Sequence, residues 1–236
     1  MFAPDRVPTR AQIADVLLKA EEGHDASANE AVELGSDRLE IVRAGLTFDL
    51  IGFDPSDAPP VPRFEHLFDV PASVNRSNVR ALYLVAGPHI AAVRRSLPVV
   101  RAQAAIAARL ADALDGVQAV VWTPADSATG ASTFAKLVRG WLAGGPFPAL
   151  GMAAFREESG GDLASIGLSY LTGQELRLSA SLRRQRDDAT RLAMRLVNFL
   201  VEAGRIDEKE TVTGPDGEAL RLVPSEDGRT VHVRGA

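Results

Sequence analysis

Two short apolar runs on either side of a helical pattern constrain the fold of this chain most strongly. The runs span residues 81–86 (Ala-Leu-Tyr-Leu-Val-Ala) and 117–122 (Val-Gln-Ala-Val-Val-Trp). Between them, apolar residues recur at alternating steps of four and three, which is typical of a helix with one buried face. A helix that connects two neighbouring parallel strands packs across them as a crossover. The pattern therefore predicts a parallel strand pair beneath a helix.

The rest of the chain adds antiparallel strands and further helices. Residues 38–53 are expected to form a β-hairpin, because apolar residues alternate with polar ones around a possible Ala44-Gly45 turn. Short strands are expected at 149–155, 163–171 and 175–180, and small hairpins around 220–223 and 230–233. We therefore expect an α+β or mixed α/β fold, in which a partly parallel sheet with one βαβ crossover carries added antiparallel strands and packed helices.

Composition divides the chain into four expected segments. Residues 1–53 form an N-terminal helix plus β-hairpin subdomain, or elements laid against the main sheet. Residues 54–78 contain five prolines, which exclude a regular helix or a central strand. The apolar residues of this connector, Phe64, Leu67 and Phe68, indicate that it is pinned onto the core. Residues 79–206 form the α/β core, and residues 207–236 form a C-terminal β-hairpin appendage.

The predicted core contains a helix with two possible starts and a predicted loop. The helix after the first apolar run begins either at Pro88 or, because of Pro98, after Ser96. Residues 123–130, which follow the second run, are expected to form a polar loop.

Charge and cysteine content exclude several classes of function. The formal net charge is −5, whereas a generic nucleic-acid-binding protein carries a basic surface. The absence of cysteine excludes disulfides and thiolate chemistry and fits a reducing compartment. The longest uncharged run is too short and too rich in glycine and proline to span a membrane. We expect a cytoplasmic protein that binds neither nucleic acid nor membrane, although Arg94 and Arg95 leave an anionic partner open.

The predicted parallel strand ends suggest one candidate catalytic site. Ligands favour the crevice beyond the carboxyl ends of parallel strands. His89 follows one of the two strands, and Asp126 and Ser127 follow the other. His89 could act as a base toward Ser127. The alternative is that all three residues are turn formers or helix caps, because Ser127 lacks a Gly-x-Ser-x-Gly elbow. No metal site or cofactor is predicted, because the four histidines lack ligand spacing.

The C-terminal part of the chain carries a pattern of three consecutive parts. They are Gly167-Leu-Ser-Tyr-Leu-Thr-Gly-Gln-Glu-Leu-Arg-Leu178, the long helix predicted after it, and Glu210-Thr-Val-Thr-Gly-Pro-Asp-Gly217. This pattern resembles a bacterial family known as domain of unknown function 4261. The resemblance covers roughly Phe147 to Val233 and extends more weakly back to Ala81. It implies a related fold and no established activity. The resemblance depends most on Glu175. Glu175 and Gln174 are candidate binding residues. The alternative for Glu175 is a structural role, as a charged residue at the start of an edge strand.

Two classes of function follow from these observations. The first is a non-enzymatic module that binds a protein partner, favoured by the terminal hairpins and the pinned connector. The second is a small hydrolase or transferase that uses His89, Asp126 and Ser127. The first predicts an exposed apolar patch, and the second predicts that His89 lies within hydrogen-bond reach of Ser127 or a carboxylate.

Overall fold

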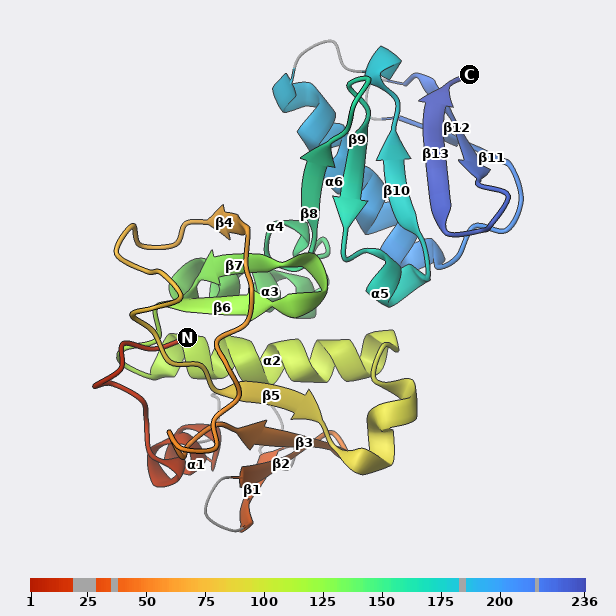
Figure 1. The fold of residues 1–236 in the computed structure, drawn as a ribbon. Coiled ribbons are helices and arrows are strands. Elements are labelled where there is room, and N and C mark those ends of the chain that lie inside the picture. The colour runs from red at the N-terminus through yellow and green to blue at the C-terminus, as the bar shows by residue number, and fades with distance from the viewer. Residues whose placement is uncertain (19–28, 35–37, 183–185, 215–216) are drawn as a thin grey trace. The chain divides into compact units, whose positions relative to one another are not determined.

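The computed structural model describes residues 1–18, 29–34, 38–182, 186–214 and 217–236. It divides the chain into two compact units (Figure 1). Unit 1 comprises residues 1–121 and 128–145, and unit 2 comprises residues 122–127 and 146–236. Helices combine with three sheets that contain both parallel and antiparallel pairs, which confirms the predicted mixed class.

Unit 1 contains an antiparallel sheet with the strand order β1-β2-β3-β5. Its strands are β1 (Asn29–Leu34), β2 (Arg38–Arg43), β3 (Leu46–Ile51) and β5 (Tyr83–Ala86). β2 and β3 form the predicted hairpin, with Arg43 opposite Leu46. Both turn residues, Ala44 and Gly45, have positive φ angles of 51° and 74°. Positive φ at both central residues is the type I′ geometry that matches strand twist.

Two helices of unit 1 share an apolar core with this sheet. They are α1 (Arg10–Leu18) and α2 (Leu97–Ala113). The fully buried side chains of this core include Ile13 and Leu17 of α1, Leu39, Ile41 and Phe48 of the sheet, and Ile106 of α2. α2 begins after Ser96 with proline in its first turn, whereas Pro88–Val93 forms a separate 3-10 helix, η2. The second of the two possible helix starts is therefore correct.

A smaller sheet has the order β4-β7-β6. Its strands are β4 (His66–Phe68), β6 (Ala119–Trp122) and β7 (Ser127–Gly130), and α3 (Ala131–Leu142) follows β7 directly. The 3-10 helix η3 (Thr123–Ala125) joins β6 to β7. All four residues of β7 are buried, so the predicted polar loop at 123–130 is wrong in its second half. Residues 127–130 pair with neighbouring strands although their side chains are small and mostly polar, because strand pairing uses backbone groups and tertiary context outweighs intrinsic strand preference.

The predicted parallel pair, residues 81–86 with 117–122, is also wrong, because β5 and β6 belong to different sheets. The N-terminal residues lie between the two segments. Phe2 exchanges two backbone hydrogen bonds with Arg80, of 2.8 and 2.9 Å, and forms a β-bridge to Val117 on its other side. The Met1 amine donates a 2.7 Å hydrogen bond to the Ala119 carbonyl. The N-terminal residues thus bond to Arg80, just before the first run, and to Gln118 and Ala119 of the second run.

Unit 2 contains a six-stranded sheet with the order β11-β12-β13-β10-β9-β8. The strands are β8 (Ala154–Glu157), β9 (Leu163–Ile166), β10 (Glu175–Leu178), β11 (Glu210–Thr213), β12 (Ala219–Pro224) and β13 (Thr230–Gly235). β10 and β13 are parallel, and the other neighbours are antiparallel. The parallel pair of this sheet thus joins β10 and β13, and α6, β11 and β12 lie between them in the chain, so it is not the βαβ crossover predicted at residues 81–122. Residues 149–152 and 169–172 form single helical turns, α4 (Ala149–Met152) and α5 (Ser169–Thr172), in place of predicted strand.

One face of this sheet carries the core of unit 2. Alternate residues of β10 and β13 are fully buried, namely Leu176, Leu178, Val231 and Val233. The helix α6 (Arg186–Ala203) runs along the sheet (Figure 1) and also has buried apolar residues along its length. The short 3-10 helix η4 (Ala180–Leu182) precedes it. Apolar residues at every second strand position thus meet an amphipathic helix, as this layered packing requires.

The compact units differ from the four segments expected from composition. Residues 1–53 belong to unit 1, where β3 pairs with β5. The expected core at 79–206 is divided between both units. The C-terminal strands continue the sheet of unit 2 through β13 and β10. Long-range strand pairing, which composition does not encode, accounts for these differences.

Candidate functional site

Glu175, the residue on which the family resemblance most depends, lies at the start of β10 and holds the preceding turn. Its Oε1 accepts hydrogen bonds from the backbone amides of Gly167 and Ser169, at 2.9 and 3.1 Å. Its Oε2 accepts from the Leu168 amide at 3.2 Å and from the Ser165 hydroxyl at 2.5 Å. The carboxylate thus satisfies free amides at the beginning of α5, as a helix-capping side chain does.

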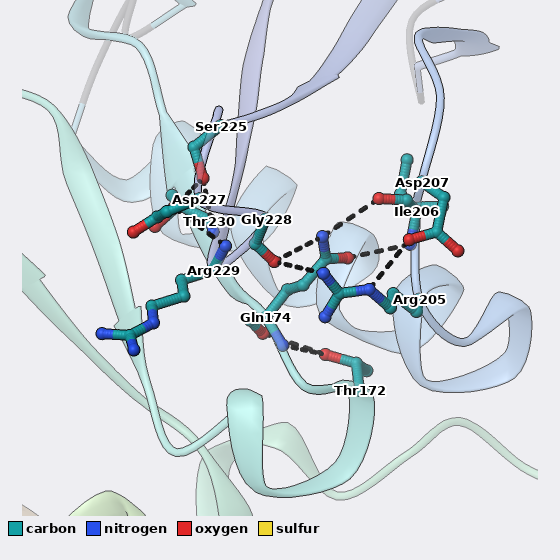
Figure 2. Close-up of polar contacts among 10 residues, drawn as sticks. All are labelled: Thr172, Gln174, Arg205, Ile206, Asp207, Ser225, Asp227, Gly228, Arg229 and Thr230. Carbon is teal, nitrogen blue, oxygen red and sulfur yellow. Dashed lines mark hydrogen bonds and ion pairs between the residues drawn. The ribbon is translucent and has the colours of Figure 1, made fainter.

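Gln174 occupies the centre of a second hydrogen-bond network, which Figure 2 shows. Its side-chain amide donates to the carbonyls of Ile206 and Gly228, both at 3.0 Å. Its side-chain oxygen accepts from the Ile206 amide at 2.8 Å. Gln174 is only 2% exposed. The side chain therefore joins the strand β10 to the segment after α6 and to the β12–β13 turn.

Arg205 and Thr172 extend this network (Figure 2). The Arg205 guanidinium donates to the Gly228 carbonyl and to the Asp207 carboxylate, both at 2.8 Å. The Thr172 hydroxyl donates to the Gln174 carbonyl at 2.9 Å. Because the Gln174 side chain bonds to Ile206 and Gly228 and its carbonyl bonds to Thr172, this residue has a structural role in unit 2.

The three predicted catalytic residues occupy different surroundings. His89 is exposed on η2 in unit 1, whereas Asp126 and Ser127 belong to unit 2. Asp126 is exposed and has a left-handed backbone, with φ of 46°. Ser127 is only 2% exposed. The argument for adjacent strand ends fails because β5 and β6 are not neighbours in one sheet.

The edge strand β4 presents two apolar side chains to solvent. Leu67 is 59% exposed and Phe68 is 37% exposed. Sequence reasoning assigned both residues to the attachment of the proline-rich connector. Instead, Val61, Phe64 and Val70 of that connector pack against a buried cluster of unit 1. In the sequence, these two residues stand out only as apolar side chains within a proline-rich segment. That pattern does not show whether the side chains face the core or the solvent.

Contacts on the C-terminal side of β4 hold the strand in place. Asp69 has a left-handed φ of 54°, and its carboxylate accepts a hydrogen bond from the Thr133 hydroxyl of α3. Its carbonyl passes so close to Gly130 that a Cβ there would lie 2.0 Å from the oxygen. Only glycine allows this approach. β4 is therefore a preformed edge strand in unit 1.

Other kinds of site receive no support from the part of the chain that the structure describes. There, no group of three or more His, Asp or Glu residues is arranged to hold a metal ion. Within the same residues, no helix has the length and apolar character needed to cross a membrane. Comparison of the chain with protein-family models, curated proteins and solved structures gives no match.

Proposed function

We propose that this protein is a non-enzymatic interaction module that binds a protein partner through the edge strand β4. The observation that carries the proposal is the exposure of Leu67 and Phe68 on a strand at the edge of a sheet. An edge strand presents unpaired backbone groups, to which a partner can add a strand of its own. Apolar side chains of the edge strand then contribute binding energy.

The expected contribution of Leu67 follows from its exposed area. Complete burial of an exposed leucine side chain contributes about 2 kcal/mol. Leu67 is already partly covered, so a partner that buries the rest gains about 1 kcal/mol from it. A lysine at this position would lose this gain and would also resist burial of its charge. We therefore expect Leu67→Lys to weaken partner binding by at least about tenfold.

Affinity capture of the tagged protein from its native cell extract tests the proposal. Leu18→Lys is the matched control, because Leu18 of α1 is 58% exposed and Leu67 is 59% exposed. The two variants carry the same change in charge at equal exposure. We expect a stoichiometric protein partner with the unmodified protein and with Leu18→Lys, and loss of that partner with Leu67→Lys. Retention of the partner by Leu67→Lys would refute binding through β4.

The alternative function, a small hydrolase or transferase, needs a substrate to reach Ser127. The 2% exposure of this residue argues against that access. A small molecule that co-purifies with the unmodified protein and is lost from a Ser127→Ala variant would favour the alternative.

Three further sequence-based expectations belong to the same proposal. They are a cytoplasmic location, a bacterial source and a relationship to domain of unknown function 4261. The structural roles of Gln174 and Glu175 are consistent with that relationship, because a fold-determining motif can persist without a shared activity.

A further inference from the structure

One face of the six-stranded sheet in unit 2 carries four arginines in two neighbouring rows. Strand register places Arg156 opposite Ala164, Ala164 opposite Arg177, and Arg177 beside His232. Val223 of β12 continues the row beyond His232. The neighbouring row contains Arg234 of β13, Arg221 of β12 and Thr211 of β11. On β10, β12 and β13 these positions alternate with buried residues that face the core, so their side chains lie on the opposite face. Ala164 of β9 lies in the same row and is itself buried.

Arg221 and Arg234 form a cross-strand pair of like charges. They lie directly opposite each other on antiparallel strands, and both are exposed. Directly opposed like charges destabilise a sheet. Among the residues that the structure describes, no carboxylate forms an ion pair with either guanidinium. A bound anion between them would remove the repulsion.

Three carboxylates lie near this face, two at the β8–β9 end and Asp227 in the β12–β13 turn, close enough to act on His232. Arg177 forms ion pairs with Glu158 and Asp162, which lie at the β8–β9 end. Burial lowers the pKa of His232, and the charges of Arg177 and Arg234 lower it further, while Asp162 and Asp227 oppose this shift. His232 is therefore neutral at pH 7. The net positive charge lies at Arg221 and Arg234, with a separate exposed guanidinium at Arg156.

We infer that this face binds an extended acidic segment of a protein. The exposed guanidiniums of Arg156 on β8 and Arg221 on β12 lie four strand spacings apart, which corresponds to about 19 Å. An extended peptide of about six residues covers that distance. Guanidinium groups bind carboxylates through paired hydrogen bonds. The named residues of the two rows include no Phe, Tyr or Trp on which nucleobases could stack, so single-stranded nucleic acid fits this face less well. This surface is independent of β4 in unit 1.

Fluorescence anisotropy with the full chain tests the inference. The probe is a labelled peptide of eight glutamates, and a labelled thymidine oligonucleotide of eight residues is the comparison. The test variant is Arg221→Gln with Arg234→Gln. The control variant is Arg195→Gln with Arg229→Gln, which removes the same charge from exposed arginines on α6 and in the β12–β13 turn.

We expect the test variant to bind the peptide about tenfold more weakly than the unmodified protein, and the control variant to bind it within about twofold. The affinity of the unmodified protein should fall as salt rises. The melting temperature of the test variant should equal or exceed that of the unmodified protein, because the like-charge pair is gone. Equal peptide affinity in both variants, a lower melting temperature of the test variant, or tighter binding of the oligonucleotide would overturn the inference.

Discussion

We expect the substitution Gln174→Met to lower the free energy of unfolding of unit 2 by about 3 kcal/mol. Methionine has nearly the same length and volume as glutamine, so the change removes the polar atoms and leaves little cavity. The three hydrogen bonds to the backbones of Ile206 and Gly228 are lost.

The magnitude follows from the groups that lose their partners. The Gly228 carbonyl keeps the hydrogen bond from Arg205, at 2.8 Å. The amide and carbonyl of Ile206 lose their bonds to Gln174, and Ile206 is only 2% exposed. Each buried polar group without a partner costs about 1–3 kcal/mol. The cost of leaving two such groups unpaired, reduced by the greater hydrophobicity of methionine, gives the expected loss of about 3 kcal/mol in the free energy of unfolding.

Urea denaturation followed by the fluorescence of Trp122 measures this change. Trp122 belongs to unit 2 and packs edge-to-face against Tyr170, with ring centroids 5.4 Å apart. A Trp141→Phe background removes the signal from unit 1 in all the proteins compared. Lys209→Met is the matched control, because Lys209 is exposed and its long side chain is replaced in the same way.

The control should change the free energy of unfolding by less than about 0.5 kcal/mol. A loss of less than about 1 kcal/mol for Gln174→Met would refute the reasoning. It would mean that water or a small backbone shift satisfies Ile206 equally well, and that the network of Figure 2 does not hold the three segments together.

Two further predictions concern Glu175 and pH. Glu175→Gln should lower the free energy of unfolding by about 2 kcal/mol, because the amide nitrogen of glutamine cannot accept the backbone hydrogen bonds that the carboxylate accepts; the same urea titration measures it, and an unchanged midpoint would contradict the capping role. Burial lowers the pKa of the Met1 amine to about 5, and the pKa of His232 is also lowered. The folded chain therefore holds fewer protons than the unfolded chain between pH 5 and 8. The free energy of unfolding should rise with pH across this range, with a slope of up to about 1.4 kcal/mol per pH unit from Met1. Urea titrations at several pH values check the sign, and stability that falls as pH rises from 5 to 8 would exclude it.

Local features of the sequence were sufficient for the elements that depend on neighbouring residues. The hairpin of β2 and β3 follows from alternation around Ala44-Gly45. The pairing of β12 with β13 follows from the turn at Glu226-Asp-Gly228. In each case the partners are close in the chain, so one pattern specifies both.

The sequence by itself thus determined the class of fold and most of the local elements, and the tertiary structure decided which strands are neighbours and what the candidate residues do. Phe2 separates the runs predicted to pair, and Ser127 is buried in a strand predicted as a loop. The roles of Gln174 and Glu175 likewise became visible only through their partners. The physical reason is that every residue except proline offers the same backbone amide and carbonyl, so the choice among distant partners leaves little trace in the side-chain pattern.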